Sequence, residues 1–140
     1  MFRFLEADMV NVFYSFRGEH SEMQHVEVQT SHYHDAIDLI DKYPWREEVA
    51  LFEEHGEGGG LFFTVGDEDD KYACFQLVPT EPDKGLLCFW LVLDKGFLGI
   101  FGKKTINTPF EEVSISEAKS KIKPLFNYSI EQLYECHKKS

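Results

Sequence analysis

The sequence predicts a single α+β domain over residues 1–140, with an antiparallel sheet of about six to eight strands and two or three helices packed mainly on one face. The chain has 140 residues, the usual size of one domain, and no Pro-, Gly- or Ser-rich linker divides it. Hydrophobic residues make up 43% of the chain and aromatic residues 15%, which is too apolar for a disordered protein. Short apolar segments separated by turn residues fill the middle of the chain, and segments with helical periodicity lie on both sides of them.

The N-terminal part predicts a hairpin of two strands followed by a helix. Residues 9–16 are rich in Val, Phe and Tyr, and residues 25–29 alternate apolar and polar side chains after a polar loop. From residue 32 to 43, apolar side chains recur mostly at intervals of three, as in an amphipathic helix. Residues 30–31 offer an N-cap for this helix, and Pro44 ends it because the residue before a proline is pushed out of helical geometry.

The middle of the chain predicts a series of short strands joined by turns rich in Gly, Pro and Asp. Strands this close in sequence pair antiparallel, because a parallel connection needs a dozen or more residues. The predicted strands cover residues 49–53, 61–65, 72–78, 86–93, 97–101 and 113–115.

Two more helices are predicted near the C-terminal end. Ser116 and Glu117 begin the first, and Pro124 weakens its end. Residues 129–137 form the second, which is short and amphipathic. Helices before and after a run of antiparallel strands give the α+β class.

The formal net charge of −11 narrows the class of partner. Nonspecific binding to nucleic acid or to anionic lipid needs a basic surface, so we expect no nucleic-acid partner and no membrane partner. The longest apolar run, residues 86–93, is too short to span a bilayer, and the first residues lack the apolar run of a signal peptide. Three widely spaced cysteines without a CxxC pair suit a reducing compartment. We therefore expect an unanchored cytoplasmic protein.

A dense group of carboxylates in the middle of the chain is the candidate partner-binding surface. Between residues 51 and 70 there are seven carboxylates and no Lys or Arg, which creates a local negative field. The alternative is a solvated face that only keeps the domain soluble. Trp45, just after the helix-ending proline, is either a core residue or an interface anchor. The candidate partner-binding residues are Trp45, Glu53, Glu54, Glu57, Asp67, Glu68, Asp69 and Asp70.

The sequence contains no catalytic motif, and we expect neither enzymatic activity nor a cofactor. His32, His34 and Asp35 are the strongest candidate metal ligands, and His20 belongs to a second, looser cluster. Residues two apart on a helix point ~200° away from each other, so His32 and His34 do not share a helix face. The glycine-rich residues 56–60 are followed by no GxSxG nucleophile and lack the Gly-Lys-Ser/Thr ending of a phosphate-binding loop. A small metal-dependent enzyme that uses His32 and His34 is the alternative.

The order of the segments resembles an immunity protein family found beside toxins in bacterial polymorphic toxin and contact-dependent competition systems. An early strand leads into a helix, Gly- and aromatic-rich strands follow, and a Val-Ser-Ile-Ser-Glu-Ala step leads into a later helix. After Phe126 the chain departs from the Gly-Pro turn and Trp-bearing end that are common in that family. The matching pieces are residues 25–28, 31–37, 58–63 and 110–118, and the resemblance covers roughly residues 25–127.

The resemblance implies a cytoplasmic protein that neutralises a cognate toxin by direct binding. A toxin that acts on nucleic acid has a basic active site, which an acidic surface can approach and occlude. A phage-type acidic inhibitor or regulatory module would use the same kind of surface and is a further alternative. Edge strands rich in Phe and Val also leave a homodimer open.

Overall fold

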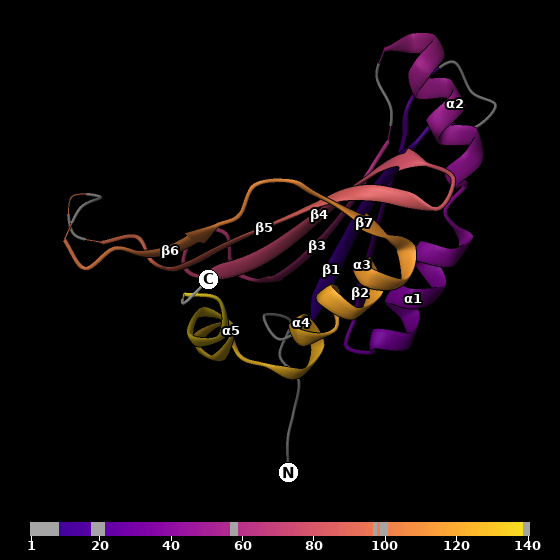
Figure 1. Cartoon of the computed structure of the whole chain (residues 1–140). Helices are drawn as coiled ribbons and strands as arrows, with labels where there is room; N and C mark the ends of the chain where they lie inside the picture. Colours follow the sequence, from indigo (N-terminus) through magenta and orange to yellow (C-terminus); the bar gives the residue numbers. More distant parts are fainter. Residues whose placement is uncertain (1–8, 18–21, 57–58, 97, 99–100, 139–140) are drawn as a thin grey trace.

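A seven-stranded antiparallel sheet organises the chain (Figure 1). The computed structural model describes residues 9–17, 22–56, 59–96, 98 and 101–138. The strands are β1 (Val10–Phe16), β2 (Gln24–Thr30), β3 (Leu61–Gly66), β4 (Tyr72–Glu81), β5 (Lys84–Asp94), β6 (Lys104–Asn107) and β7 (Glu111–Ser114). Their order is β2-β1-β3-β4-β5-β6, and β7 pairs with the first half of β5 while β6 pairs with its second half. The sheet and its helices confirm the predicted α+β class.

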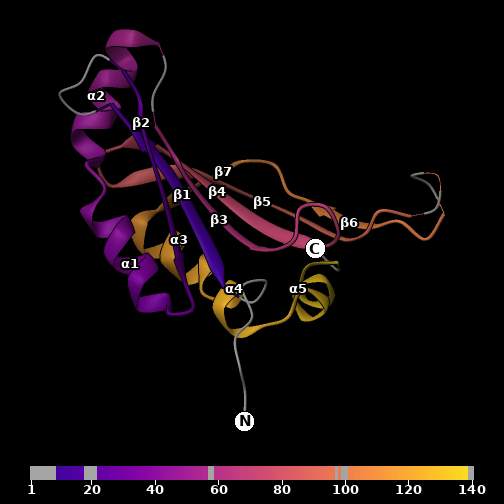
Figure 2. The same cartoon turned by 180° about the vertical axis from the view of Figure 1, so that it is seen from behind.

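The helices are α1 (Tyr33–Lys42), α2 (Trp45–His55), α3 (Ile115–Ile122), the single turn α4 (Pro124–Asn127) and α5 (Ile130–His137). Helices α1, α3, α4 and α5 lie on one face of the sheet, and α2 lies at the end of the sheet away from α5 (Figures 1 and 2). The helices are more numerous than the two or three expected, mainly because residues 45–55 are helical.

The core lies between the sheet and the helices on that face. Successive side chains of a strand point to opposite faces, so every second residue of the central strands is buried. Phe75 of β4 and Phe89 of β5 are direct partners in the register, and their ring centroids are 4.5 Å apart. The helices contribute small and branched apolar side chains to this layer: Ala36, Ile40, Ala118, Ile122, Leu125 and Leu133.

The prediction of a strand at residues 49–53 is wrong, because these residues belong to α2. Glu48, Val49 and Phe52 lie at helical spacing, and Glu47 and Glu48 are in the first turn, where carboxylates favour the helix dipole. Gly56 ends the helix in the left-handed conformation with φ +76°. A run of apolar residues this short fits a strand or a helix, and here the helical spacing favours the helix.

The N-cap residues of α1 and α3 differ from the predicted ones, whereas the predicted N-cap of α5 is confirmed. Ser114, not Ser116, caps α3, where its hydroxyl accepts from the Glu117 N–H and the Glu117 carboxylate accepts from the Ser114 N–H. Ser129 caps α5 with the same reciprocal pattern, so the predicted start of that helix is confirmed. The N-cap of α1 is His32, which makes no side-chain cap bond; Thr30 instead donates to the Asp35 carboxylate at 2.6 Å.

The strand predicted at residues 97–101 falls mostly outside the described residues, and β6 follows it at residues 104–107. The other predicted strands are confirmed, and β4 and β5 are longer than expected because they continue to a tight turn at residues 82–83. Within the described parts of the chain, no helix has both the length and the apolar character needed to cross a bilayer.

Candidate functional site

The sheet face away from the helices carries a row of aromatic side chains. The ring centroids of Phe13 and His25 are 5.8 Å apart, those of Phe13 and Phe62 6.2 Å, and those of Phe62 and Trp90 6.4 Å. These four residues come from β2, β1, β3 and β5, and we call them the aromatic row. Phe13 is 37% exposed, so part of this apolar surface faces solvent.

Cys74 on β4 is a small residue beside the rings of Phe62 and Trp90 in the aromatic row. Cys74 lies opposite Thr64 on β3 and opposite Trp90 on β5, and it lines the same hollow as Phe62 and Trp90. Cys74 is 2% exposed, and this burial raises the pKa of its thiol to about 12, while a hydrogen bond from the Thr64 hydroxyl at 3.2 Å acts in the opposite direction. Such a thiol stays protonated at neutral pH and is a packing group rather than a nucleophile.

We expect one fast-reacting thiol in the native protein. Cys136 is exposed, whereas Cys74 and Cys88 are buried and have raised pKa values because of desolvation. Ellman's reagent at pH 8 should modify about one thiol quickly, and the Cys136→Ser variant should lose that fast phase. The Trp90→Ala variant should speed up modification of Cys74, because it removes the large ring that lies directly opposite Cys74 on β5. Fast modification of Cys74 in the wild-type protein would contradict the Phe62–Trp90 contact.

Carboxylates stand beside the aromatic row. Glu27 on β2 lies directly opposite Phe13 and accepts a hydrogen bond from the Asn11 amide at 2.7 Å. Glu68, in the turn after β3, lines the same hollow of about 430 Å³ as Phe13, Phe62 and Trp90. This surface therefore combines an apolar floor with acidic groups at two of its edges.

The structure does not bring the seven predicted carboxylates together. Glu53 and Glu54 are exposed on the last turn of α2, whereas Asp67, Glu68, Asp69 and Asp70 form the exposed turn between β3 and β4. The six residues of β3 separate the two groups by about 20 Å. Lys71 binds Glu131 of α5 at 2.7 Å, which places this turn at the α5 end of the sheet, away from α2 (Figure 1). Glu57 lies outside the described residues. The single acidic surface from residue 53 to 70 is thus corrected to two separate acidic clusters.

Trp45 is a core residue and not an exposed anchor. It is 6% exposed, its indole N–H donates to the Ile40 carbonyl at 2.7 Å, and its ring packs edge-on against Tyr43. Tyr43 in turn donates to the Ser15 carbonyl at 2.7 Å. Trp45 therefore packs inside the α1–α2 junction, which Tyr43 attaches to β1, and its place among the candidate partner-binding residues is corrected.

The candidate metal ligands do not converge. His32 and His34 are exposed at the start of α1, where His34 faces Asp38 one turn later at 3.5 Å. Among the residues that the structure describes, no three His, Cys, Asp or Glu side chains are grouped closely enough to hold a metal ion. His20 lies outside those residues.

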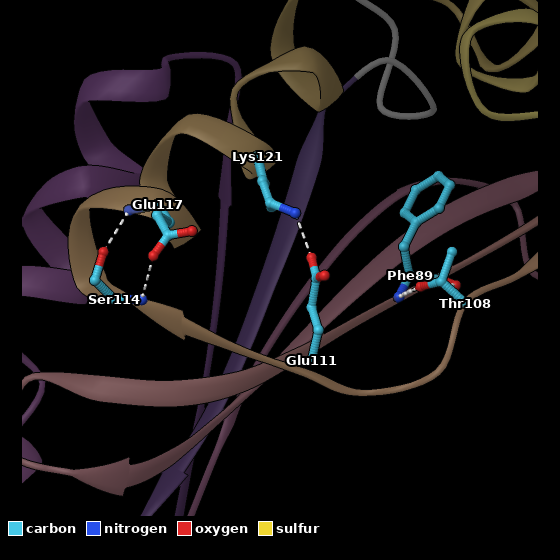
Figure 3. A network of polar contacts seen from close by, with 6 residues as sticks. All are labelled: Phe89, Thr108, Glu111, Ser114, Glu117 and Lys121. Atoms are coloured by element: carbon cyan, nitrogen blue, oxygen red, sulfur yellow. Dashed lines mark hydrogen bonds and ion pairs between the residues drawn. The ribbon is translucent and has the colours of Figure 1, made fainter. Parts of the chain in front are cut away.

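A second hollow of about 430 Å³ lies on the helix side, where the β6–β7 connection and α5 approach β5. Its polar contacts join elements of the fold to one another (Figure 3). The Thr108 hydroxyl accepts from the Phe89 N–H at 3.0 Å and donates to the Phe89 carbonyl, and Lys121 pairs with Glu111. The His137 ring stacks on Phe89 with centroids 4.5 Å apart. These contacts attach the C-terminal elements to β5, so we assign this hollow a structural role.

No protein-family model, curated protein or solved structure matches this chain. The resemblance to the immunity protein family stays a prediction from the sequence, and the candidate site depends on the structure of this chain.

The aromatic row was missed by the sequence analysis. Phe62 and Phe63 are adjacent, yet one belongs to the aromatic row and the other to the core. Alternation along β3 shows that the two rings point to opposite faces, but it does not show which face the helices cover. One signal in the sequence could have indicated the site. Asn11 and Phe13 alternate with the buried Val10 and Val12 along β1, so they lie on the opposite face of the sheet, and the neighbouring strand carries Glu27.

Proposed function

We propose that this protein binds and neutralises a cognate bacterial toxin through the aromatic row and the carboxylates beside it. The observation that carries the proposal is a partly exposed apolar surface on the sheet face away from helices α1, α3, α4 and α5. The kind of partner comes from the sequence resemblance and from the charge of the chain.

Aromatic side chains on a rigid sheet suit a protein interface. Trp and Tyr are enriched among the residues that dominate binding energy, and aromatic rings cover a large area at little cost in conformational entropy. The contacts of Phe62 with both Phe13 and Trp90 hold the rings in position before a partner arrives. Such preorganisation lowers the entropic cost of association.

The charge beside the aromatic row favours a basic partner. Glu27 and Glu68 line the same hollow as the rings, and the chain as a whole has a formal charge of −11. An acidic surface speeds association with a cationic one and disfavours nucleic acid, whose phosphates it repels. A toxin with a basic active site has the complementary charge.

The test is binding to the product of the neighbouring gene, measured by size-exclusion chromatography and calorimetry. We expect a one-to-one complex and loss of toxin activity within it. The Phe13→Asp and Trp90→Ala variants should each weaken binding by about 2 kcal/mol or more, roughly 30-fold, because they remove an aromatic anchor. The matched control is Phe52→Asp, which changes an exposed Phe on α2 and should leave affinity unchanged.

Two further measurements sharpen the test. Thermal unfolding of each variant separates loss of binding from loss of the fold. Association should also slow as salt increases, and Glu68→Lys should reduce the association rate more than the dissociation rate changes. Absence of a complex, or full affinity in both Phe13→Asp and Trp90→Ala, would overturn the proposal.

A further inference from the structure

The hollow beside the aromatic row combines small side chains with large rings. Asn11 on β1, Thr64 on β3 and Cys74 on β4 are successive partners in the register of three neighbouring strands, and all three line the hollow (Figure 1). The rings of Phe62 and Trp90 line it as well. Because short side chains follow one another across the sheet beside large ones, the surface is hollowed there to about 430 Å³.

The charged groups of this hollow are carboxylates. Glu27 lines it from β2 and Glu68 from the turn after β3, and no Lys or Arg is among the described residues around it. Neither carboxylate forms an ion pair with another residue that the structure describes. Lys95 and Lys103 line the neighbouring hollow on the β6 side of Trp90, and Glu68 borders both hollows. The end at Glu27 is therefore the more negative one, and we call the hollow that contains it the acidic hollow.

One oxygen atom at the Glu27 end has no donor. The Nδ2 group of Asn11 donates to the Glu27 carboxylate at 2.7 Å, and this bond identifies the amide nitrogen, since the reverse orientation would place two oxygens together. The Oδ1 atom of Asn11 is buried, and no donor among the described residues binds it. A buried acceptor without a partner costs free energy. This oxygen is therefore suited to a donor from another molecule.

We infer that the acidic hollow binds the guanidinium group of an arginine side chain of the partner. The group donates to the Oδ1 atom of Asn11 and to the Glu27 carboxylate, and its flat face lies against the rings of Phe13 and Phe62. Arginine fits better than lysine, because its five donors lie in one plane and it stacks on aromatic rings. An anionic group would be repelled, and an apolar side chain would leave the Asn11 oxygen unpaired.

This inference rests on the proposed function for the identity of the partner, and it specifies the side chain that the toxin presents. Arginine is common where proteins bind phosphate, because its guanidinium group can donate two parallel hydrogen bonds. An arginine held by Asn11 and Glu27 has those donors occupied and cannot use them on a phosphate. Binding in the acidic hollow would thus remove a phosphate-binding group from the active site of a toxin that acts on nucleic acid.

The test uses the protein alone and a small probe, N-acetylargininamide, titrated at pH 8 and low salt and followed by NMR of the isotope-labelled chain. At this pH an ordinary histidine is uncharged, so changes in histidine charge do not affect the result. We expect low-millimolar binding that shifts the Asn11 side-chain amide and the Trp90 indole N–H but not the indole N–H of Trp45, which is buried and bonded to Ile40. N-acetylcitrullinamide has a similar shape without the charge and should bind about tenfold more weakly or less. N-acetyllysinamide should bind at least about threefold more weakly than the arginine probe.

Variants of the site and a matched control separate this contact from the general charge of the chain. Glu27→Gln and Asn11→Leu should each weaken probe binding about tenfold, because each removes an acceptor. Asn11→Asp should strengthen it about threefold or more, because it adds a second carboxylate, and a gain of binding cannot come from unfolding. Glu53→Gln removes one exposed carboxylate on α2, the same change in net charge as Glu27→Gln, and should leave probe binding unchanged.

Several outcomes would overturn the inference. These are no shift at the solubility limit of the probe, equal affinity for the arginine and citrulline probes, equal affinity for the arginine and lysine probes, and equal losses in Glu27→Gln and Glu53→Gln. The result is also distinct from that of the toxin-binding test. Probe binding without a complex with the product of the neighbouring gene would reject the toxin partner and keep the guanidinium site. A complex without probe binding would keep the toxin partner and reject the site.

Discussion

The Phe63→Ala variant is expected to lower the free energy of unfolding by about 3–5 kcal/mol. Phe63 is fully buried, and it lies between Val12 of β1 and Phe75 of β4 in the register of the sheet. Removing its ring loses the transfer free energy of the buried atoms and leaves a cavity under the helices. Because β3 is hydrogen-bonded to β1 on one side and to β4 on the other, it cannot move to fill the cavity. Urea unfolding followed by circular dichroism measures the change.

Phe62→Ala is the matched control, because it makes the same chemical change one residue earlier on the same strand. Phe62 belongs to the aromatic row, where the variant loses ring contacts with Phe13 and Trp90 but opens no cavity in the core. We expect a loss of no more than about 1.5 kcal/mol. If Phe62→Ala were the more destabilising of the two variants, the assignment of the helix-covered face would be reversed.

The Gly66→Ala variant is expected to destabilise the fold by more than about 2 kcal/mol. Gly66 ends β3 with φ +97°, and an added Cβ would lie 2.4 Å from the Lys71 carbonyl oxygen and 2.6 Å from Cδ1 of Ile130. The Lys71 oxygen cannot move away without loss of the 2.8 Å hydrogen bond that it accepts from the Asp67 N–H. The substitution therefore combines backbone strain with a backbone clash in the turn that carries Glu68.

Gly56→Ala separates these two effects. Gly56 has φ +76° at the end of α2, but an added Cβ would meet no atom within 4 Å. Only the left-handed backbone penalty applies there, about 1 kcal/mol. Chemical denaturation of both variants, at the same pH and salt, gives the comparison. Equal losses would show that the contact with the Lys71 carbonyl is unimportant and that φ alone determines the cost.

Much of the fold could be predicted from the sequence, because its strongest signals are local. The β1–β2 hairpin and α1 have a period that fits one kind of element, and β3, β4 and β5 are short apolar segments bounded by turn residues. Pro44 ends α1 because it restricts the backbone of the residue before it, and Ser129 begins α5 because its side-chain hydroxyl caps the helix; the structure has both boundaries. Where the pattern of side chains and the residues at its ends indicated the same element, the prediction was correct.

The errors arose where local patterns were ambiguous or where the answer lay in tertiary packing. Residues 49–53 fit a short strand as well as the middle of α2, and only the full stretch to Gly56 distinguishes the two. Closeness in sequence suggested one acidic surface, but β3 carries the chain across the sheet between Glu54 and Asp67. The aromatic row depends on four strands that meet in space, so no single segment reveals it.

Strand β5 pairs with two other strands along one edge, and this arrangement determines where the length of the chain can change over evolution. One edge of this strand holds β7 through pairs such as Gly85–Val113 and holds β6 through pairs such as Leu91–Ile106. The second half of β5 and β6 form a hairpin, and just after β6 the Thr108 hydroxyl binds Phe89 of β5. Residues can be inserted into or deleted from the connection of this hairpin without shifting the register of β7 or the start of α3. Natural variants should therefore differ in the length of the hairpin while the buried layer keeps its pattern.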